Sequence, residues 1–85
     1  MREETAKNSR FFKLYNSVNT RIYSFLLIIV HNHDDAEELL QETATIMWEQ
    51  FDQYQEGTHF GAWAIAIARN KAMEFLRKNK KTRMV

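Results

Sequence analysis

The sequence predicts a small all-α protein, a bundle of three main helices with room for short extra helical turns. The chain has 85 residues, enough for one small domain. It contains no proline and two glycines, too few turn residues for a fold of many strands. Apolar residues make up 45% of the chain and recur at intervals of three and four, which excludes disorder and is typical of helices.

The first helix is predicted from about Ser9 to His31. Apolar side chains recur there at helical spacing and define its buried stripe: Phe11, Phe12, Leu14, Tyr15, Val18, Ile22, Phe25, Leu26 and Ile29. The segment 25–30 is apolar all round, so we expect that end to be covered on most sides. Asn32 is the predicted terminator of this helix.

The second helix is predicted to begin at Asp34 and to end near Asp52. Asp34 is the predicted N-cap, with Glu37 three residues later as in a capping box. Acidic residues crowd the first turn, where the helix dipole favours them. Its inward stripe is predicted to consist of Ala36, Leu39, Leu40, Thr43, Met47 and Phe51.

The third helix is predicted to begin near Thr58, as N-cap, and to run to about Asn79. The preceding segment 53–59 lacks apolar periodicity and contains Gly57, so it is predicted to be a loop. One arc of the helix is apolar: Phe60, Ala64, Ile65, Ile67, Ala68, Ala72, Phe75 and Leu76. The opposite arc carries Arg69, Asn70, Met73 and Arg77. We expect a single domain over residues 1–85, with an ordered core of about 9–80 and a basic tail, 78–85, that frays.

Charge is strongly segregated along the chain although the net charge is only +1. Residues 34–56 contain eight acidic and no basic side chains, whereas residues 57–85 contain seven basic and one acidic. Such segregation favours two different partners, one basic and one polyanionic. The alternative is that two solvated helix faces simply differ in sign.

The composition disfavours catalysis and metal binding. There is no cysteine, which excludes disulfides and thiolate zinc sites. The histidines, His31, His33 and His59, are a poor ligand set, and no serine has a histidine on the same helix face to act as base. We expect no enzyme, no catalytic residue, no metal and no cofactor. The longest apolar run is too short to span a membrane and no signal peptide is present, so a soluble intracellular protein is expected.

Two surfaces are candidates for partner binding. The outer face of the second helix has no lysine or arginine on the same helix to neutralise its acids, and it comprises Glu38, Gln41, Glu42, Thr45 and Glu49. In the loop and third helix, planar groups lie near cations, a combination suited to unstacked bases and phosphates: Tyr54, His59, Trp63, Arg69, Asn70 and Arg77. The alternatives are a merely solvated acidic face and a Trp63 that belongs to the core.

Two blocks of sequence across one short loop resemble region 2 of bacterial RNA polymerase sigma factors of the extracytoplasmic-function (ECF) group. The matching stretches are DAEELLQET (35–43), Trp48, Phe51-Asp52, FGAW (60–63), IARN (67–70) and FLR (75–77). The resemblance covers about Phe11 to Lys81, and the joint spacing of the two blocks is its specific feature.

The resemblance implies a small helical, non-catalytic, cytoplasmic domain that takes part in transcription initiation. One helix face would dock on the coiled coil of the polymerase β′ subunit, and the loop with the next helix would recognise the promoter −10 element as it melts. The implied polymerase-binding residues are Glu38, Gln41, Glu42, Thr45 and Trp48. An anti-sigma factor is a further implied partner, and no membrane is.

The resemblance also implies the DNA-binding residues. A loop pocket for a flipped base of the non-template strand would be formed by Tyr54, Gln55, Glu56, Gly57 and Thr58. Asn70 matches the position near the upstream edge of the element, with Met73 on the same arc. Phosphates would be held by Arg69, Lys71, Arg77 and Lys78.

Three departures qualify the resemblance. Ala66 and Ile67 stand where housekeeping sigma factors carry melting aromatics, so strand opening is expected to be weaker. Lys71 stands where an apolar residue is common. The helix-turn-helix domain that reads the −35 element is absent, so we expect a fragment or a factor that continues beyond Val85. The alternative function is a protein-interaction bundle with an incidental basic tail; a helix-turn-helix reader of closed duplex is disfavoured because the loop precedes one long helix.

Overall fold

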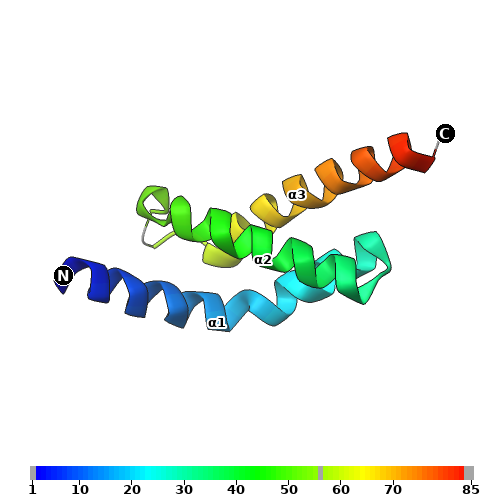
Figure 1. The fold of residues 1–85 in the computed structure, drawn as a ribbon. Helices are drawn as coiled ribbons and strands as arrows, with labels where there is room; N and C mark the ends of the chain where they lie inside the picture. Colours follow the sequence, from blue (N-terminus) through cyan, green and yellow to red (C-terminus); the bar gives the residue numbers. More distant parts are fainter. Residues whose placement is uncertain (1, 56, 84–85) are drawn as a thin grey trace.

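The computed structural model describes residues 2–55 and 57–83, with side chains described for residues 5–55 and 57–79. Within these residues the chain forms α1 (Arg2–Val30), α2 (His33–Glu49), a short 3₁₀ helix η1 (Phe51–Gln53) and α3 (Phe60–Arg83), and no strand (Figure 1). The predicted all-α class, with three main helices and a short extra turn, is therefore confirmed.

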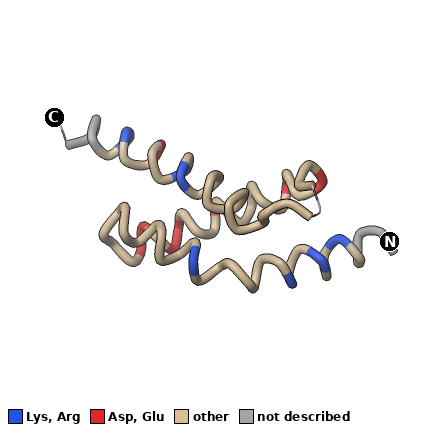
Figure 2. The backbone as a smooth tube through the Cα atoms, turned by 180° about the vertical axis from the view of Figure 1, so that it is seen from behind, with Lys and Arg blue, Asp and Glu red and all other residues tan. Residues whose placement is uncertain are grey.

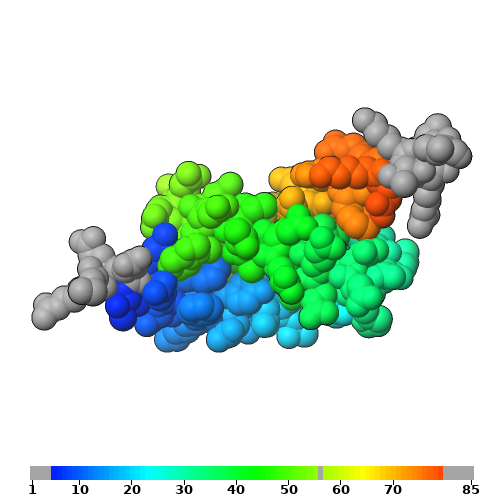
Figure 3. Space-filling view, viewed as in Figure 1, coloured from blue at the N-terminus to red at the C-terminus, as the bar shows by residue number. Residues whose placement is uncertain are grey.

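The helices form an elongated bundle of about 52 × 21 × 21 Å. α1 and α2 make an antiparallel hairpin, and α3 returns along it so that each of the three helices contacts the other two (Figure 1). In the space-filling view α2 lies directly on α1, and the orange part of α3 lies above the end of the hairpin where α1 meets α2 (Figure 3). No helix in the described part of the chain has both the length and the apolar composition needed to cross a membrane.

The core lies where the three helices meet. On α1 and α2 most residues of the predicted stripes are buried or partly buried, with Ile22, Leu26 and Met47 fully enclosed. On α3 the residues that face the core are small, with alanines at every fourth position: Ala64, Ala68 and Ala72. Because residues four apart share one face of a helix, this row of alanines lets α3 approach the hairpin closely.

Two predicted core residues are wrong. Phe12 is 58% exposed, because its neighbour Phe11 takes the inward position and successive helical residues point about 100° apart. Leu76 is 38% exposed, whereas its neighbour Phe75 packs against the core.

The connection between α1 and α2 lies one residue earlier than expected, since α2 begins at His33. α1 ends at Val30, and His31 adopts a left-handed conformation (φ 56°) while its N–H donates to the carbonyl of Leu27 at 2.9 Å. Asn32 then caps α2, because its side-chain oxygen accepts a hydrogen bond from the N–H of Asp35 at 2.9 Å. The predicted cap at Asp34 is wrong, and Asn32 begins the second helix in place of ending the first.

The other helix ends also differ from expectation. α1 begins at Arg2 and not at Ser9, and in these early turns Lys7 contacts Asp52 and Trp48. α2 ends at Glu49 and passes into η1. α3 continues to Arg83, beyond the predicted end near Asn79.

The predicted N-cap of α3 at Thr58 is wrong as well. α3 begins at Phe60, and the ring Nδ1 of His59 accepts a hydrogen bond from the N–H of Ala62 at 3.0 Å. The Thr58 hydroxyl instead donates to the carbonyl of Gln55 at 2.6 Å. Thr58 therefore closes the loop, and His59 satisfies an N–H of the first helical turn.

Candidate functional site

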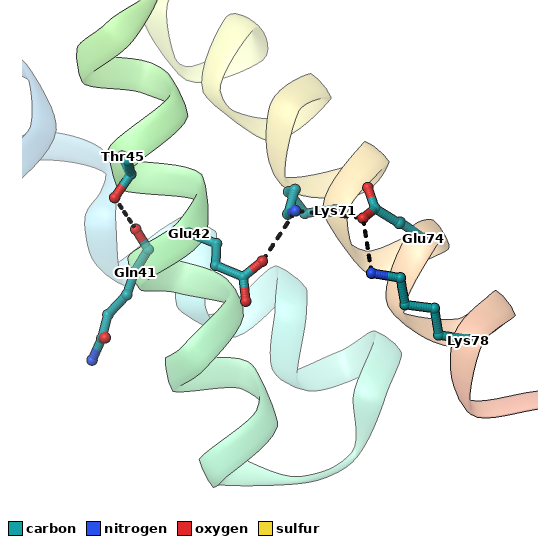
Figure 4. Close-up of polar contacts among 6 residues, drawn as sticks. All are labelled: Gln41, Glu42, Thr45, Lys71, Glu74 and Lys78. Carbon is teal, nitrogen blue, oxygen red and sulfur yellow. Dashed lines mark hydrogen bonds and ion pairs between the residues drawn. The ribbon is translucent and has the colours of Figure 1, made fainter. Parts of the chain in front are cut away.

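The outer face of α2 brings the predicted polymerase-binding residues together. Glu38, Gln41 and Thr45 are exposed, and Glu42 and Trp48 are partly buried at the edges of the face. The Thr45 hydroxyl donates to the carbonyl of Gln41 at 3.1 Å, within the helix (Figure 4). The side chains of Glu38 and Gln41 form no hydrogen bond or ion pair with any other described residue and are available to a partner.

The acidic face is not wholly without counter-ions, because α3 supplies one. Lys71 Nζ lies 3.0 Å from Glu42 Oε1 and 3.7 Å from Glu74 Oε1, and Lys78 Nζ lies 3.4 Å from Glu74 (Figure 4). The hydrogen bond to Glu42 is the main cause that raises the pKa of Lys71 above its ordinary value of 10.5. The hydrogen bond from Lys78, followed by the charge of Lys71, lowers the pKa of Glu74. The network ties the acidic face of α2 to the basic helix α3.

An apolar hollow of about 340 Å³ lies beside this face, between α1 and α2. We call it the α1–α2 hollow, and it is lined by Asn8, Phe11, Phe12, Ala44, Thr45 and Trp48. The Trp48 ring meets Phe11 edge to face at 5.3 Å, and Lys7 Nζ lies 4.3 Å from its centre. The lining residues on α1 were not predicted as site residues, although two adjacent phenylalanines on one helix already imply that one of them points away from the core.

The loop before α3 is held by an aromatic cluster. Tyr54 stacks on the fully buried Phe51, and its ring contacts Phe60 and Trp63 at 5.1 and 5.3 Å between centres. Its hydroxyl donates to the carbonyl of Thr58 at 2.7 Å. Trp63 is half-buried against the core, so the alternative interpretation, that this residue belongs to the core, is correct in part. The ring of Tyr54 is thus fixed in one orientation before any ligand arrives.

A second hollow, of about 300 Å³, lies between the loop and α1. We call it the α1–loop hollow, and it is lined by Arg10, Lys13, Leu14, Tyr54 and Gly57. Gly57 has φ 92°, a conformation that other residues adopt only with strain, and a Cβ there would meet no atom within 4 Å. Two of the predicted loop residues therefore line a real depression, whereas the residues from α1 were missed.

Gln55 and Thr58, the other predicted loop residues that the structure describes, are not among the residues that line this hollow. Gln55 and Thr58 are exposed, and Glu56 lies outside the described residues. On α3 the predicted residues Arg69, Asn70, Met73, Arg77 and Lys78 are exposed, whereas Lys71 is partly buried in its ion pairs. Figure 2 shows lysine and arginine along α1 and α3 and most acids on α2 and near η1.

The three histidines are used structurally. His33 Nδ1 lies 2.6 Å from the Tyr23 hydroxyl, His59 caps α3, and His31 forms the left-handed turn. The described residues contain no group of three or more histidine or acidic side chains that could hold a metal ion.

Comparison with known proteins agrees with this arrangement. Residues 14–82 match the family model of sigma-70 region 2. The chain is also similar to the ECF RNA polymerase sigma factor SigX of Bacillus subtilis (strain 168), with 27% identity over 73 residues. That match covers 86% of this chain and 38% of the relative, so the chain spans well under half of the relative's length. Since the family match includes all of α2, the loop and nearly all of α3, the chain belongs to the sigma-70 region 2 family.

Proposed function

We propose that this chain is the region 2 module of a sigma factor of the ECF group and acts in transcription initiation. It would bind the β′ coiled coil of RNA polymerase through α2 and the promoter −10 element through the loop and α3. The observation that carries the proposal is the placement of an acidic face and of a basic, aromatic-lined hollow on one small rigid bundle. The name of the similar SigX protein supports the ECF assignment.

The polymerase-binding part of the proposal concerns Glu38, Gln41, Glu42, Thr45 and Trp48. Carboxylates on an exposed face favour a partner with basic side chains, and the adjacent α1–α2 hollow offers apolar area for an anchor residue. Glu42 already pairs with Lys71 at 3.0 Å, so a polymerase cation would share or replace that partner. Glu38 has no competing partner among the described residues, which makes it the cleaner position to test.

Charge reversal tests this part. Glu38→Lys should weaken binding to a β′ coiled-coil fragment at moderate salt by about 1–3 kcal/mol, if the charge pair is desolvated. Glu37→Lys changes the same charge on the same helix about 100° away and is the matched control. The thermal midpoint of both variants should stay close to that of the unaltered chain. An unchanged β′ affinity in Glu38→Lys would reject docking through this face.

The DNA-binding part assigns the loop residues 54–58 to one unpaired base. The fixed ring of Tyr54 supplies an apolar wall, and the exposed Gln55 can address the base edge. Extruding a paired base costs a few kcal/mol, and Ala66 and Ile67 offer no aromatic ring to help. The chain should therefore prefer DNA that is already single-stranded.

The residues on α3 are assigned to the backbone and the upstream edge. Asn70 can read a base edge because its amide both donates and accepts hydrogen bonds. Met73 lies on the same arc, and Arg69, Arg77 and Lys78 are exposed cations for phosphates. Lys71 would reach a phosphate only by leaving Glu42, so its contribution is expected to be the smallest of this set.

Single-stranded oligonucleotides test this part. Tyr54→Ala should lose about 1–3 kcal/mol of affinity and relax the preference at one base. Arg77→Ala should weaken all sequences alike and lower the salt slope by about 0.7, the value for one phosphate contact to a single strand. A uniform loss in Tyr54→Ala would reject the base pocket. Equal affinity for duplex and single strand would reject recognition of melted DNA, and binding only to β′ would favour a protein-interaction module.

A further inference from the structure

We propose that α1 forms the second wall of the nucleic-acid site, with Arg10 and Lys13 binding the phosphates that flank a base held in the α1–loop hollow. This inference rests on the proposed function and deepens it, because that function places the site on the loop and α3 alone. It names two further binding residues on a helix that the sequence assigned to the core.

The lining of the hollow suits one nucleotide of a single strand. Leu14 and Tyr54 provide the apolar sides, and Gly57 leaves its edge open because a Cβ there would meet nothing within 4 Å. Arg10 and Lys13 are exposed and stand on the same lining. An apolar, aromatic surface bordered by cations matches the alternation of base and phosphate along single-stranded DNA. The volume of about 300 Å³ is at the lower end of the range for ligand sites.

Arg10 and Lys13 also differ from their neighbour Lys7 in having no acidic partner. Among the described residues, no carboxylate lies within 4 Å of either of these two cations, whereas Lys7 Nζ lies 3.3 Å from Asp52. The guanidinium of Arg10 lies 4.9 Å from the centre of the Phe51 ring, a cation–π contact that orients the side chain without neutralising it. The charge of Arg10 is therefore oriented at the hollow, and both positive charges are left for an external anion.

The same face of α1 continues toward α3. Arg21 lies on this face, about three turns after Arg10, and approaches the first turn of α3 so closely that a Cβ at Gly61 would lie 2.7 Å from its Nη1. The cations of α1 therefore lead from the hollow to the N-terminal end of α3, as the blue segments of Figure 2 indicate. A strand that passes the hollow would meet positive charge on α1 as well as on α3.

The test measures binding of the 85-residue chain to labelled single-stranded oligonucleotides over a range of salt concentrations. The variants are Arg10→Ala, Lys13→Ala and, as a charge-conserving partner, Arg10→Lys. Lys7→Ala is the matched control, since it removes the same charge from the same helix outside the hollow. Thermal midpoints, measured in parallel, show that the exposed variants remain folded.

We expect Arg10→Ala and Lys13→Ala each to weaken binding about threefold at low salt and to lower the salt slope by about 0.7. Arg10→Lys should retain the slope, and Lys7→Ala should leave it unchanged. Because Lys13 and Tyr54 would hold the same nucleotide, the double variant Lys13→Ala, Tyr54→Ala should lose less affinity than the two single losses combined.

Three outcomes would overturn the inference, and they differ in what they say of the proposed function. Unchanged affinity in both alanine variants, with losses in Tyr54→Ala and Arg77→Ala, would remove α1 from the site and leave the proposed function intact. No binding of single strands by the unaltered chain would overturn both. If Arg10→Ala and Lys13→Ala lose binding to a polyglutamate peptide but retain their DNA affinity, the α1 cations would be assigned to an acidic protein partner.

Discussion

The α1–α2 hollow and the α1–loop hollow share a wall but differ in chemistry. Residues 10–13 occupy one turn of α1, yet Phe11 enters the core, Phe12 faces the first hollow, and Arg10 and Lys13 face the second. The first hollow adjoins the acidic face of α2, and the second is bordered by cations. A single turn of helix therefore contributes to the core and to two surfaces of different character, and substitutions within it should separate them.

The substitution with the largest expected effect removes Phe51, a core residue that supports both hollows. Phe51 is fully buried, meets Phe11 edge to face at 5.3 Å and stacks on Tyr54, so it supports one lining residue of each hollow. Phe51→Ala should lower the free energy of unfolding by about 3–5 kcal/mol, a large share of what a small domain has. Urea denaturation measures this loss, and both binding activities should fall together. Phe12→Ala, which removes an exposed ring, should lower the free energy of unfolding much less. An equal loss would show that Phe12 is buried in solution.

The next substitution acts on one hollow alone. Trp48→Ala removes the ring that lines the α1–α2 hollow and should weaken binding to the β′ fragment by about 1–3 kcal/mol. Affinity for single-stranded DNA should be unchanged, because Trp48 does not line the α1–loop hollow. Tyr54→Ala is the reciprocal variant and should show the opposite pattern. If each variant weakens both ligands equally, the two hollows do not act as separate sites.

Much of the fold follows from local sequence pattern. The number of helices and most of the buried positions come from apolar spacing, which each segment carries by itself. The ends were less predictable, because they depend on which of several capable residues captures an N–H: Asn32 and not Asp34 at α2, His59 and not Thr58 at α3. The early start of α1 at Arg2 was missed because the segment before Ser9 has no apolar periodicity.

The candidate sites divide in the same way. The acidic face of α2 was predictable because its members share one helix and one side of it. The ion pair of Glu42 with Lys71, and the meeting of Arg10 and Lys13 with Tyr54, join segments far apart in the chain. Such pairings require the packing of whole helices against one another. The sequence therefore indicated the two surfaces, and only the fold showed that residues of α1 line the hollows beside them.

A buried hydroxyl offers a change in stability that should leave both hollows alone. Thr43 is fully buried, and its hydroxyl has no hydrogen-bond partner among the described residues. An unpaired polar atom in the core costs free energy, so Thr43→Val, which keeps the branched shape, should raise the free energy of unfolding by about 1 kcal/mol. The measurement is the urea midpoint, with Thr45→Val at an exposed position as control. A destabilised Thr43→Val would mean that the hydroxyl finds a partner in solution.

The smallest expected effect is the pH dependence of the tie between α2 and α3. The pKa of Glu74 is lowered by its hydrogen bond with Lys78 and then by the charge of Lys71, so its contribution is present above its ordinary value of 4.5 and is lost as pH falls through its folded value. The pKa of Lys71 is raised, chiefly by Glu42, so its contribution is present below 10.5 and is lost as pH rises through the folded value. Exposed pairs contribute little, so the thermal midpoint should fall by only about 2–4 °C at either extreme of pH through these groups.

The variant Lys71→Met isolates the contribution of these groups, because it lacks the cation common to the Glu42 and Glu74 pairs. Its thermal midpoint should fall less steeply at both low and high pH. Neither hollow is lined by these side chains, and Lys71 makes the smallest expected phosphate contribution, so Lys71→Met should change the affinity for single-stranded DNA only slightly at neutral pH. A large loss of DNA affinity in Lys71→Met would instead place Lys71 on a phosphate and make Glu42 its competitor.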